Sequence, residues 1–518
     1  MLQRRFYVTT PIYYVNDIPH IGHAYTTIAV DVVARYKRLK GYDVLFLTGS
    51  DEHGQKVEES ARKMQIKPIE LADRVVDKFK NLWEKLDISN SDFIRTTERR
   101  HKDAVSYLWN TVKSKGDIYL GTYEDWYCKP CETFWTEKQL IEESCPDCRR
   151  PVERLKEPSY FFRMSRYQER LLRHINENPD FIQPESKKNE IINFIREGLR
   201  DLSVSRTSFS WGITVPDDPK HVMYVWFDAL TNYLAAVGYP NEMPYWPANL
   251  HIIGKDILRF HAIYWPTFLM SAGLPLPQKI FAHGWWTVEG QKMSKSIGNV
   301  IDPDEMVNRF GVDQFRYFLM RGVPFGQDGD FSIKVFIERT NSDLANDLGN
   351  LLSRTLSMIE KYFEGKVPSL PNGPYDPDSP IGTQREMQLK SLIEENTEAD
   401  FDHFMDKLQF SNALLKVWDV IDDANRCIED TAPWVLWKEG KTEKLSVTLY
   451  TLAETLRIIA YFLYPFMPRS MEEILRQLGI EKRLADTQMD EAIRWGRLEE
   501  GTKISKGSPL FPKVDRIP

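Results

Sequence analysis

Several features are scarce or missing in this chain of 518 residues. It has only five cysteines, no apolar run long enough to span a membrane and no internal repeat, which excludes a disulfide-rich scaffold, a membrane-spanning helix and a repeat architecture. The N-terminus leads directly into a predicted strand and shows no signal-peptide pattern. We therefore expect a cytoplasmic protein that does not enter a membrane.

A surplus of positive charge is also missing. The 68 basic and 75 acidic residues give a formal net charge of −7, so the molecule has no global field that attracts nucleic acid. Local basic patches still allow a specific RNA partner. Candidate patches lie at residues 35–38, 99–102 and 187–188, with a solvated surface as the alternative for each.

What is present indicates a large globular protein. The apolar content of 42% and the charged content of 28% are ordinary for folded chains. The length is sufficient for two to four domains with a large buried core.

Strand and helix patterns alternate in two separate parts of the chain, as in a parallel α/β sheet. Between these parts, cysteines, aromatics and turns replace the alternation, so we interpret residues 114–221 as an insertion. From residue 341 the patterns are helical. The expected strands are 5–10, 43–48, 251–253 and 279–283, and the expected helices are 22–40, 68–86, 98–115, 255–270, 344–362, 401–428 and 445–466.

The segment Pro19–His23 (Pro-His-Ile-Gly-His) follows the first predicted strand and begins the first predicted helix. Its two histidines are three residues apart, so they share one face of the first turn. A helix N-terminus favours an anion, and Gly22 lets a nucleotide approach the backbone closely. The alternative is an ordinary helix with two capping or solvated histidines.

A second motif, Lys292–Ser296 (Lys-Met-Ser-Lys-Ser), lies between Gly290 and Gly298 in a stretch with few apolar residues. This pattern predicts a mobile loop whose two ammonium groups close on a triphosphate and meet the charge of leaving pyrophosphate. Alone, such a stretch is more often a solvated lysine loop. Together, the two motifs favour a site that holds ATP from both sides.

Four of the five cysteines form two Cys-x-x-Cys pairs separated by 13 residues: Cys128, Cys131, Cys145 and Cys148. Two such pairs complete a tetrahedral thiolate site for zinc, and four thiolates leave no open position, so the metal is structural. Two disulfides are the alternative, which a cytoplasmic location disfavours. Cys427 stands alone on a helical pattern and is expected in the core.

The two phosphate motifs together resemble the hallmark motifs of class I aminoacyl-tRNA synthetases. Four further segments narrow the resemblance to the bacterial methionyl-tRNA synthetases: Thr9–Tyr14, Gly49–Gly54, Tyr224–Ala229 and Gly254–Ile257. The similarity runs through nearly the whole chain. It implies a methionine–tRNA ligase with a single zinc knuckle.

The resemblance also implies the fold and its division. The expected fold is α/β, with a Rossmann-like parallel-sheet catalytic domain split by the zinc-knuckle insertion and followed by an α-helical anticodon-binding bundle. The expected parts are residues 1–113 and 222–285 for the two catalytic halves, 114–221 for the insertion, 286–340 for the lysine loop and stem-contact region, and 341–518 for the bundle. The insertion is too small for a large editing domain, and no appended C-terminal dimerisation domain is expected, so we expect a monomer.

Methionine-binding residues follow from the same resemblance. Asp51 corresponds to the carboxylate that pairs with the substrate ammonium group, and His261 corresponds to a polar group beside the side chain. The other residues expected around methionine are Ile12, Tyr14, Trp226, Ala229, Tyr233, Ile257, Phe260 and Trp265. Sulfur near aromatic edges is mildly favourable, although core packing is the ordinary role of such residues.

The implied reaction has two steps. Methionine attacks the α-phosphorus of Mg²⁺-bound ATP to give methionyl-adenylate and pyrophosphate, and the acyl group then moves to the 2′-hydroxyl of the terminal adenosine of initiator or elongator tRNA(Met). Because no protein nucleophile is needed, the rate depends on positioning and charge stabilisation. The expected catalytic residues are His20, His23, Lys292 and Lys295, with further ATP contacts from Gly22, Lys255, Asp256 and Ser294.

The helical region resembles the domain that reads the CAU anticodon. Asn350 and Arg354 are one helical turn apart, and Trp434 follows a helix break at Ala432–Pro433, where its indole can stack on a base. A surface Asn/Arg pair and a buried Trp are the alternative.

Two other functions compete with this interpretation. One is another class I synthetase, of which the cysteinyl enzyme is disfavoured because no cysteine lies near the first strand. The other is a catalytically inactive paralogue that binds tRNA.

Overall fold

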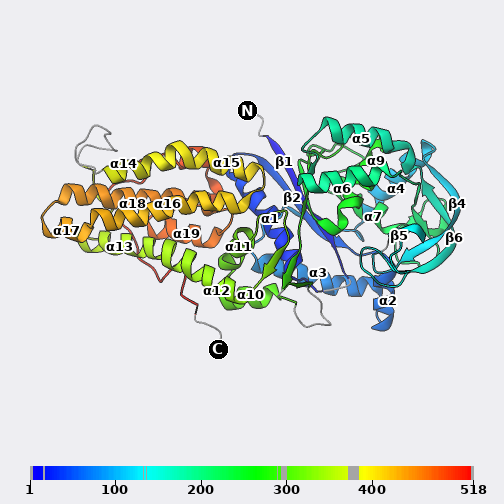
Figure 1. The fold of residues 1–518 in the computed structure, drawn as a ribbon, viewed down its shortest axis with the longest axis horizontal. Helices are drawn as coiled ribbons and strands as arrows, with labels where there is room; N and C mark the ends of the chain where they lie inside the picture. Colours follow the sequence, from blue (N-terminus) through cyan, green and yellow to red (C-terminus); the bar gives the residue numbers. More distant parts are fainter. Residues whose placement is uncertain are drawn as a thin grey trace.

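A six-stranded parallel sheet lies at the centre of the molecule, between a helical bundle at one end and an antiparallel insertion at the other (Figure 1). This computed structural model describes residues 4–15, 18–131, 133–135, 137–288, 290–292, 300–370 and 384–514.

The strand order of the central sheet is β3-β2-β1-β12-β13-β7, and every pairing is parallel. The order reverses between β1 and β12, which is where ligands bind in open parallel sheets. The predicted Rossmann-like sheet is therefore confirmed, with one addition from the segment 114–221, the edge strand β7. The strands are β1 (Arg5–Tyr14), β2 (Asp43–Asp51), β3 (Asp92–Arg95), β7 (Ile182–Gln183), β12 (Leu250–Gly254) and β13 (Ile280–His283).

Helix α1 (Ile21–Leu39) connects β1 to β2 and is buried at 15 of its 19 positions. Helix α1 lies between the sheet and the elements that follow residue 300 (Figure 1), which accounts for this burial. The other helices around the sheet are α2 (Gln55–Lys63), α3 (Pro68–Lys85), α4 (Arg99–Ser114), α7 (Val225–Leu230), α8 (Asn232–Ala235) and α9 (Trp265–Ala272).

The helix expected over residues 255–270 is not regular. It starts with the 3₁₀ turn η3 (Lys255–Ile257), continues through the π-helical turn η4 (Phe260–Tyr264) and becomes α-helical only in α9. Single π-helical turns are frequent at functional sites, and this one carries Phe260 and His261.

The insertion is built on an antiparallel sheet of order β5-β4-β6-β8. The long pair β4–β6 runs in register from Ile118 opposite Phe162 to Tyr127 opposite Glu153, so it carries the cysteines at its far end. The elements of this region are β4 (Ile118–Cys128), β5 (Thr133–Trp135), η1 (Glu137–Gln139), β6 (Glu153–Phe162), η2 (Met164–Tyr167), α5 (Gln168–Glu177), α6 (Glu185–Arg196), β8 (Leu202–Ser203), β9 (Ser205–Arg206), β10 (Thr214–Val215) and β11 (Asp218–Met223).

A small sheet and three helices join the two large parts. The sheet has the order β15-β14-β16, and its strand β15 leads into the predicted lysine loop. The elements are β14 (Trp286–Val288), β15 (Gln291–Lys292), α10 (Pro303–Phe310), α11 (Val312–Arg321), β16 (Gly329–Phe331) and α12 (Ile333–Arg339).

The region after residue 339 is helical, which confirms the predicted bundle. Its elements are η5 (Thr340–Gly349), α13 (Asn350–Tyr362), α14 (Gln384–Ser391), η6 (Leu392–Thr397), α15 (Glu398–Asp406), α16 (Phe410–Thr431), α17 (Pro433–Lys438), α18 (Thr442–Leu463), α19 (Pro468–Gln477), η7 (Leu484–Asp486) and α20 (Met489–Ala492).

One helix prediction in the bundle is wrong. The helix expected over 401–428 is two helices, because Leu408 has a left-handed backbone with φ of 58°. That conformation is costly for leucine, and burial of the Leu408 side chain offsets the cost.

The side chain of Asp31 connects α1 to two other parts of the fold, the chain after α3 and helix α11. Its carboxylate accepts hydrogen bonds from Arg35 Nε at 2.8 Å, Arg316 Nη2 at 2.7 Å and the backbone N–H of Ser89 at 2.7 Å. Arg316 also donates to the backbone carbonyls of Pro465 and Phe466, at 2.9 Å each. Burial alone would raise the pKa of Asp31, but the two guanidinium groups hold it well below its usual value.

Among the described residues, none of the helices combines the length and the apolar character that crossing a membrane requires.

We expect Asp31→Asn to lower the free energy of unfolding by about 3–5 kcal/mol at neutral pH, because it leaves buried guanidinium charge without its partner. The pKa of Asp31 is lower in the folded chain than in the unfolded one, so this contribution is present above about pH 4 and is lost as the pH falls towards the folded value. Denaturant unfolding of both proteins at neutral and acid pH measures it.

The control is Asp406→Asn, which removes an exposed ion pair with Lys37 and should change stability little. Equal small effects of the two substitutions would contradict the structural role of Asp31.

Candidate active site

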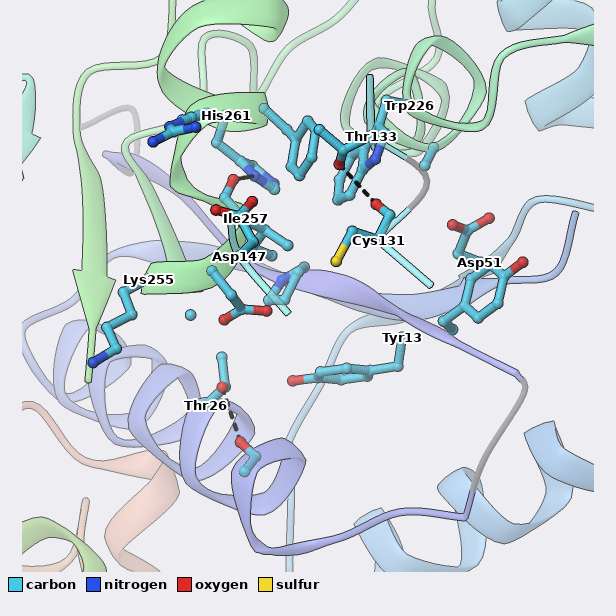
Figure 2. Close-up of a pocket in the computed structure, with 18 of the residues that line it drawn as sticks. Tyr13, Thr26, Asp51, Cys131, Thr133, Asp147, Trp226, Lys255, Ile257 and His261 are labelled. Carbon is cyan, nitrogen blue, oxygen red and sulfur yellow. Dashed lines mark hydrogen bonds between the residues drawn. The ribbon is translucent and has the colours of Figure 1, made fainter. Parts of the chain in front are cut away.

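A cavity of about 860 Å³ lies at the carboxyl ends of β1, β2 and β12, where the strand order of the sheet reverses. Side chains from the sheet, the helices beside it and the cysteine-bearing turn surround this space (Figure 2). The predicted site residues that line the cavity are Ile12, Tyr14, His20, Gly22, His23, Asp51, Trp226, Ala229, Tyr233, Lys255, Asp256, Ile257, Phe260 and His261.

The two histidines of the first motif cap helix α1. His20 is the N-cap residue, and its Nδ1 accepts the backbone N–H of Gly22 at 3.1 Å; Nδ1 of His23 accepts the backbone N–H of His20, also at 3.1 Å. The two rings stack with centroids 3.9 Å apart. Because both Nδ1 atoms are acceptors, both Nε2 atoms carry a proton. Burial and the neighbouring His20 lower the pKa of His23 well below its usual value, so His23 is neutral at physiological pH.

Gly22 is required by the cap itself. A Cβ atom at this position would lie 2.9 Å from Cε1 of His20, so any side chain would displace the imidazole.

Asp51 is the last residue of β2 and is buried at the cavity. Figure 2 shows Asp51 and Trp226 on the same cavity, which also contacts His261. Trp226, on α7, stacks on Phe260 with centroids 3.7 Å apart and an interplanar angle of 9°. These rings come from α7, which precedes β12, and from the π-helical turn η4, which follows it.

His261 is held in one tautomer by its partners. Its Nδ1 lies 3.0 Å from the carbonyl oxygen of Ile257, to which it donates, so its Nε2 accepts the hydroxyl proton of Tyr233 at 2.8 Å. Burial lowers the pKa of His261 to about 4, which keeps the ring neutral. The cavity therefore presents a polar but uncharged Tyr–His pair beside aromatic rings.

Trp265 does not line the cavity. It is fully buried, and its ring lies 6.0 Å from Tyr233 and 5.9 Å from Trp246. This position lets it support the Tyr233 ring from behind.

Lys255 and Asp256 belong to a cluster that the sequence did not predict. The ammonium group of Lys255 donates to both carboxylate oxygens of Asp328, at 2.7 and 2.6 Å, and lies 4.3 Å from the ring centroid of Trp285. Trp285 donates its backbone N–H to Asp328 and its indole N–H to Asp256, at 2.8 and 3.1 Å. These contacts connect the end of β12 to the sheet that carries the lysine motif.

The lysine motif lies mostly outside the described residues. The backbone of Lys292 belongs to β15, opposite Thr287 of β14, whereas the Lys292 side chain and residues 293–299, including Ser294 and Lys295, are not described.

The four cysteines form one cluster, in which all sulfur atoms lie within 4.8 Å of one another. The Sγ atoms of Cys128 and Cys148 are 3.5 Å apart, and those of Cys131 and Cys145 are 3.9 Å apart. Four sulfurs at about 2.3 Å from a tetrahedral zinc are separated by about 3.8 Å, so the donor set and its geometry fit zinc. No disulfide joins the cysteines.

The cysteine-bearing turn is also part of the cavity. Pro130, Cys131, Thr133, Asp147 and Cys148 line it, and Figure 2 shows Cys131, Thr133 and Asp147 beside the Trp226 and His261 side chains. Lys56, at the start of α2, donates to the carbonyl of Pro130 and lies 5.1 Å from the ring centroid of Tyr14.

A buried carboxylate between two histidines was missed by the sequence analysis. Asp228 lies 2.6 Å from His53 Nδ1 and 2.6 Å from His101 Nε2. Burial opposes its ionisation, but the two imidazoles lower the pKa of Asp228 to about 2. The three residues come from α7, from the turn after β2 and from α4. Their contacts fix the position of α7, which carries Trp226, relative to the end of β2, which carries Asp51. Only the position of His53 and Asp228 inside the quoted motifs could have indicated this contact.

The three predicted anticodon residues lie in the bundle. Asn350 is exposed at the start of α13, and Arg354, one turn later, donates to Glu429 at 2.6 Å. Trp434 lies on α17 and is 39% exposed, which contradicts the buried alternative. Glu429 is close to the C-terminal end of α16, which immediately precedes α17.

Two of the predicted basic patches have structural partners. Arg35 is buried against Asp31 and Tyr464, and Arg100 pairs with Asp92 and Glu98. Lys187 is also paired, with Glu190 at 2.7 Å, and both residues line the cavity.

Comparisons with known proteins identify the family of this chain. The family model described as tRNA synthetases class I (M) matches residues 6–157 and 150–356, and the model described as the anticodon binding domain of methionyl tRNA ligase matches residues 377–516.

Curated relatives match along nearly the whole chain. The methionine–tRNA ligase of Caldanaerobacter subterraneus is 53% identical over 99% of this chain and 80% of its own length, and that of Bacillus subtilis is 50% identical over 98% and 78%. Among solved structures, Mycobacterium tuberculosis methionyl-tRNA synthetase in complex with methionyl-adenylate has a TM-score of 0.93 and 45% identity, covering 98% of this chain and 100% of that one. The chain therefore belongs to the methionyl-tRNA synthetase family of class I aminoacyl-tRNA synthetases.

Proposed function

We propose that this protein is a methionine–tRNA ligase, which forms methionyl-adenylate from L-methionine and ATP and transfers methionine to tRNA(Met). One observation carries the proposal: a single cavity at the reversal point of the sheet contains both the histidine cap of α1 and the aromatic pocket beside Asp51. The similarity to a relative solved with methionyl-adenylate supports the same assignment.

The phosphates of ATP would lie at the N-terminus of α1. His20 and His23 would donate from Nε2 to phosphate oxygens, and the helix N-terminus adds partial positive charge. Neutral donors that are already oriented by backbone N–H groups need no rearrangement when charge develops on the α-phosphate. Mg²⁺ would arrive with ATP and offset phosphate charge.

The amino acid would lie between Asp51 and the aromatic rings. The Asp51 carboxylate would pair with the ammonium group, leaving the substrate carboxylate free to attack the α-phosphorus. The Tyr233–His261 pair would face the thioether together with Trp226 and Phe260. Because the pair is uncharged, it would contribute shape and weak polarity to the pocket. A substrate with one methylene more or less would lose about 1–3 kcal/mol of binding free energy.

Lys255, Lys292, Ser294 and Lys295 would complete the phosphate site. Lys255 is held by Asp328, so a phosphate oxygen must compete with that carboxylate for the ammonium group. The lysine loop would approach from the β14–β15 hairpin and stabilise the leaving pyrophosphate, with Lys295 as the main contributor.

The remaining proposals concern tRNA and assembly. Asn350, Arg354 and Trp434 would read the CAU anticodon, and the cysteine cluster would hold one structural zinc. We keep the division into residues 1–113, 114–221, 222–285, 286–340 and 341–518 as the functional layout. We also propose that the protein is a cytoplasmic monomer. Sedimentation of the purified protein tests the oligomeric state.

ATP–pyrophosphate exchange with each amino acid tests the assignment. We expect exchange that depends on methionine. Exchange with another amino acid would favour a different class I synthetase, and exchange with none would favour an inactive tRNA-binding paralogue.

Lys295→Ala should slow adenylate formation by about 10²–10³-fold, the range typical for removal of one charge-stabilising group, while methionine binding changes little. Single-turnover pyrophosphate release and equilibrium binding of methionine separate the two effects. Lys334→Ala, at an exposed position on α12, is the control. A collapse of methionine binding would show that the loop supports the fold instead.

Trp434→Ala should reduce tRNA charging at limiting tRNA by on the order of tenfold, since base stacking on an aromatic ring contributes about 1–3 kcal/mol. Methionine-dependent exchange should be nearly unchanged because it needs no tRNA. Leu415→Ala, which truncates another exposed apolar side chain, is the matched control. Equal loss of charging and exchange would assign Trp434 a structural role.

Cys131→Ser should remove the zinc, because a tetrahedral site closed by four thiolates loses affinity when one ligand is replaced. Elemental analysis should find one zinc per wild-type chain and much less in the variant, whereas Cys427→Ala, buried on α16, should keep the metal. Methionine-dependent exchange should also fall, since Cys131 lines the cavity. A variant that retained full zinc would contradict the four-thiolate site.

A further inference from the structure

Only two of the chain's 14 tryptophans, all of which the structure describes, are exposed, and both lie on the six-residue helix α17. Trp434 is 39% exposed and Trp437 is 46% exposed. Large aromatic side chains that remain open to water mark recognition surfaces more often than packing defects. Trp434 has a proposed role at the anticodon, whereas Trp437 has none.

Trp437 is backed by a second aromatic ring. It stacks on Tyr362, the last residue of α13, with ring centroids 5.0 Å apart and an interplanar angle of 26°. A ring stacked on one face and exposed on the other is a preformed flat platform. It loses little conformational freedom when a planar ligand covers it.

The platform is continuous with the proposed anticodon site. Tyr362 belongs to the same i, i+4 row of α13 as Asn350 and Arg354, through Met358. Arg354 contacts Glu429 near the end of α16, and Trp437 follows Trp434 by three residues on α17. The row on α13 and the α16–α17 turn therefore form one surface at the far end of the bundle (Figure 1).

Charged neighbours favour a nucleic acid on this surface. The Lys361 ammonium lies 5.3 Å from the ring centroid of Tyr362, and Lys438, next to Trp437, is exposed. The nearby Glu439 pairs with Lys441 at 2.6 Å, which reduces its repulsion of phosphate. Aromatic platforms beside lysines are the arrangement that binds successive unpaired bases and their backbone.

We propose that Trp437, supported by Tyr362, is a second base-stacking site, which binds an unpaired base of the tRNA anticodon loop outside the three anticodon bases. This inference rests on the proposed function, because the RNA is the tRNA that the enzyme charges. Two indoles one helical turn apart hold two bases of the same loop, so the site extends recognition beyond the anticodon.

The test uses the full chain and an RNA hairpin with the CAU anticodon loop, in which 2-aminopurine replaces one loop base at a time. Stacking on an indole quenches the fluorescence of this base. We expect Trp437→Ala to weaken hairpin binding by on the order of tenfold and to relieve the quenching at one loop position outside the anticodon. Trp437→Phe should retain most of both signals, and Leu415→Ala should match the wild type.

Two results would overturn the inference while the proposed function stands. One is Trp437→Ala with wild-type affinity and quenching at every position. The other is Trp437→Ala with the same changes at the anticodon positions as Trp434→Ala, which would mean that Trp437 only holds α17 in place. A wild-type chain that does not bind the hairpin would overturn the proposed function and the inference with it.

Discussion

The arrangement of the molecule depends on the hydrogen bonds and ion pairs of one buried carboxylate, that of Asp31. It lies inside α1, the helix whose first turn carries the histidine cap, and it binds Arg35, Arg316 and Ser89. Arg316 in turn binds the backbone that follows α18. Because breaking such a buried charge cluster is costly, α1 keeps one orientation relative to both the sheet and the helical bundle. The proposed phosphate site and the proposed anticodon surface are thereby held on one framework.

The proposed chemistry depends on neutral groups that are oriented before the substrate binds. Backbone N–H groups fix the tautomers of His20 and His23, and the Ile257 carbonyl fixes that of His261. Burial lowers the pKa of His23 and His261, so neither adds positive charge beside the substrate ammonium group. The positive charge of the site comes from lysines, of which Lys255 is paired with Asp328. In this proposed division, the oriented imidazole donors and the lysine charge serve different parts of the site.

The cysteine cluster has a second consequence besides local stability. A knuckle of this size has little core of its own, and the proposed zinc would order it. Its Cys131 and Asp147 line the cavity, and its Pro130 accepts from Lys56. The proposed zinc, at the far end of the β4–β6 arm, would therefore help to shape the cavity. At the opposite end of the molecule, the short helix α17 is also positioned by a contact outside itself, the stacking of Trp437 on Tyr362 of α13.

The sequence by itself determined the features that depend on local pattern: the parallel-sheet halves, the bundle, the cysteine spacing and the short motifs, each of which needs only neighbouring residues to be recognised. It did not determine contacts between distant residues, such as Lys255 with Asp328 or Asp228 with His53 and His101, because pairing across the fold leaves no periodicity in the chain. It also failed where tertiary packing overrides helix propensity, at the π-helical turn of Phe260–Tyr264 and at Leu408. Only the tertiary structure decided that Trp265 lies behind the cavity and Trp437 on the surface, since burial depends on what the rest of the chain places around a side chain.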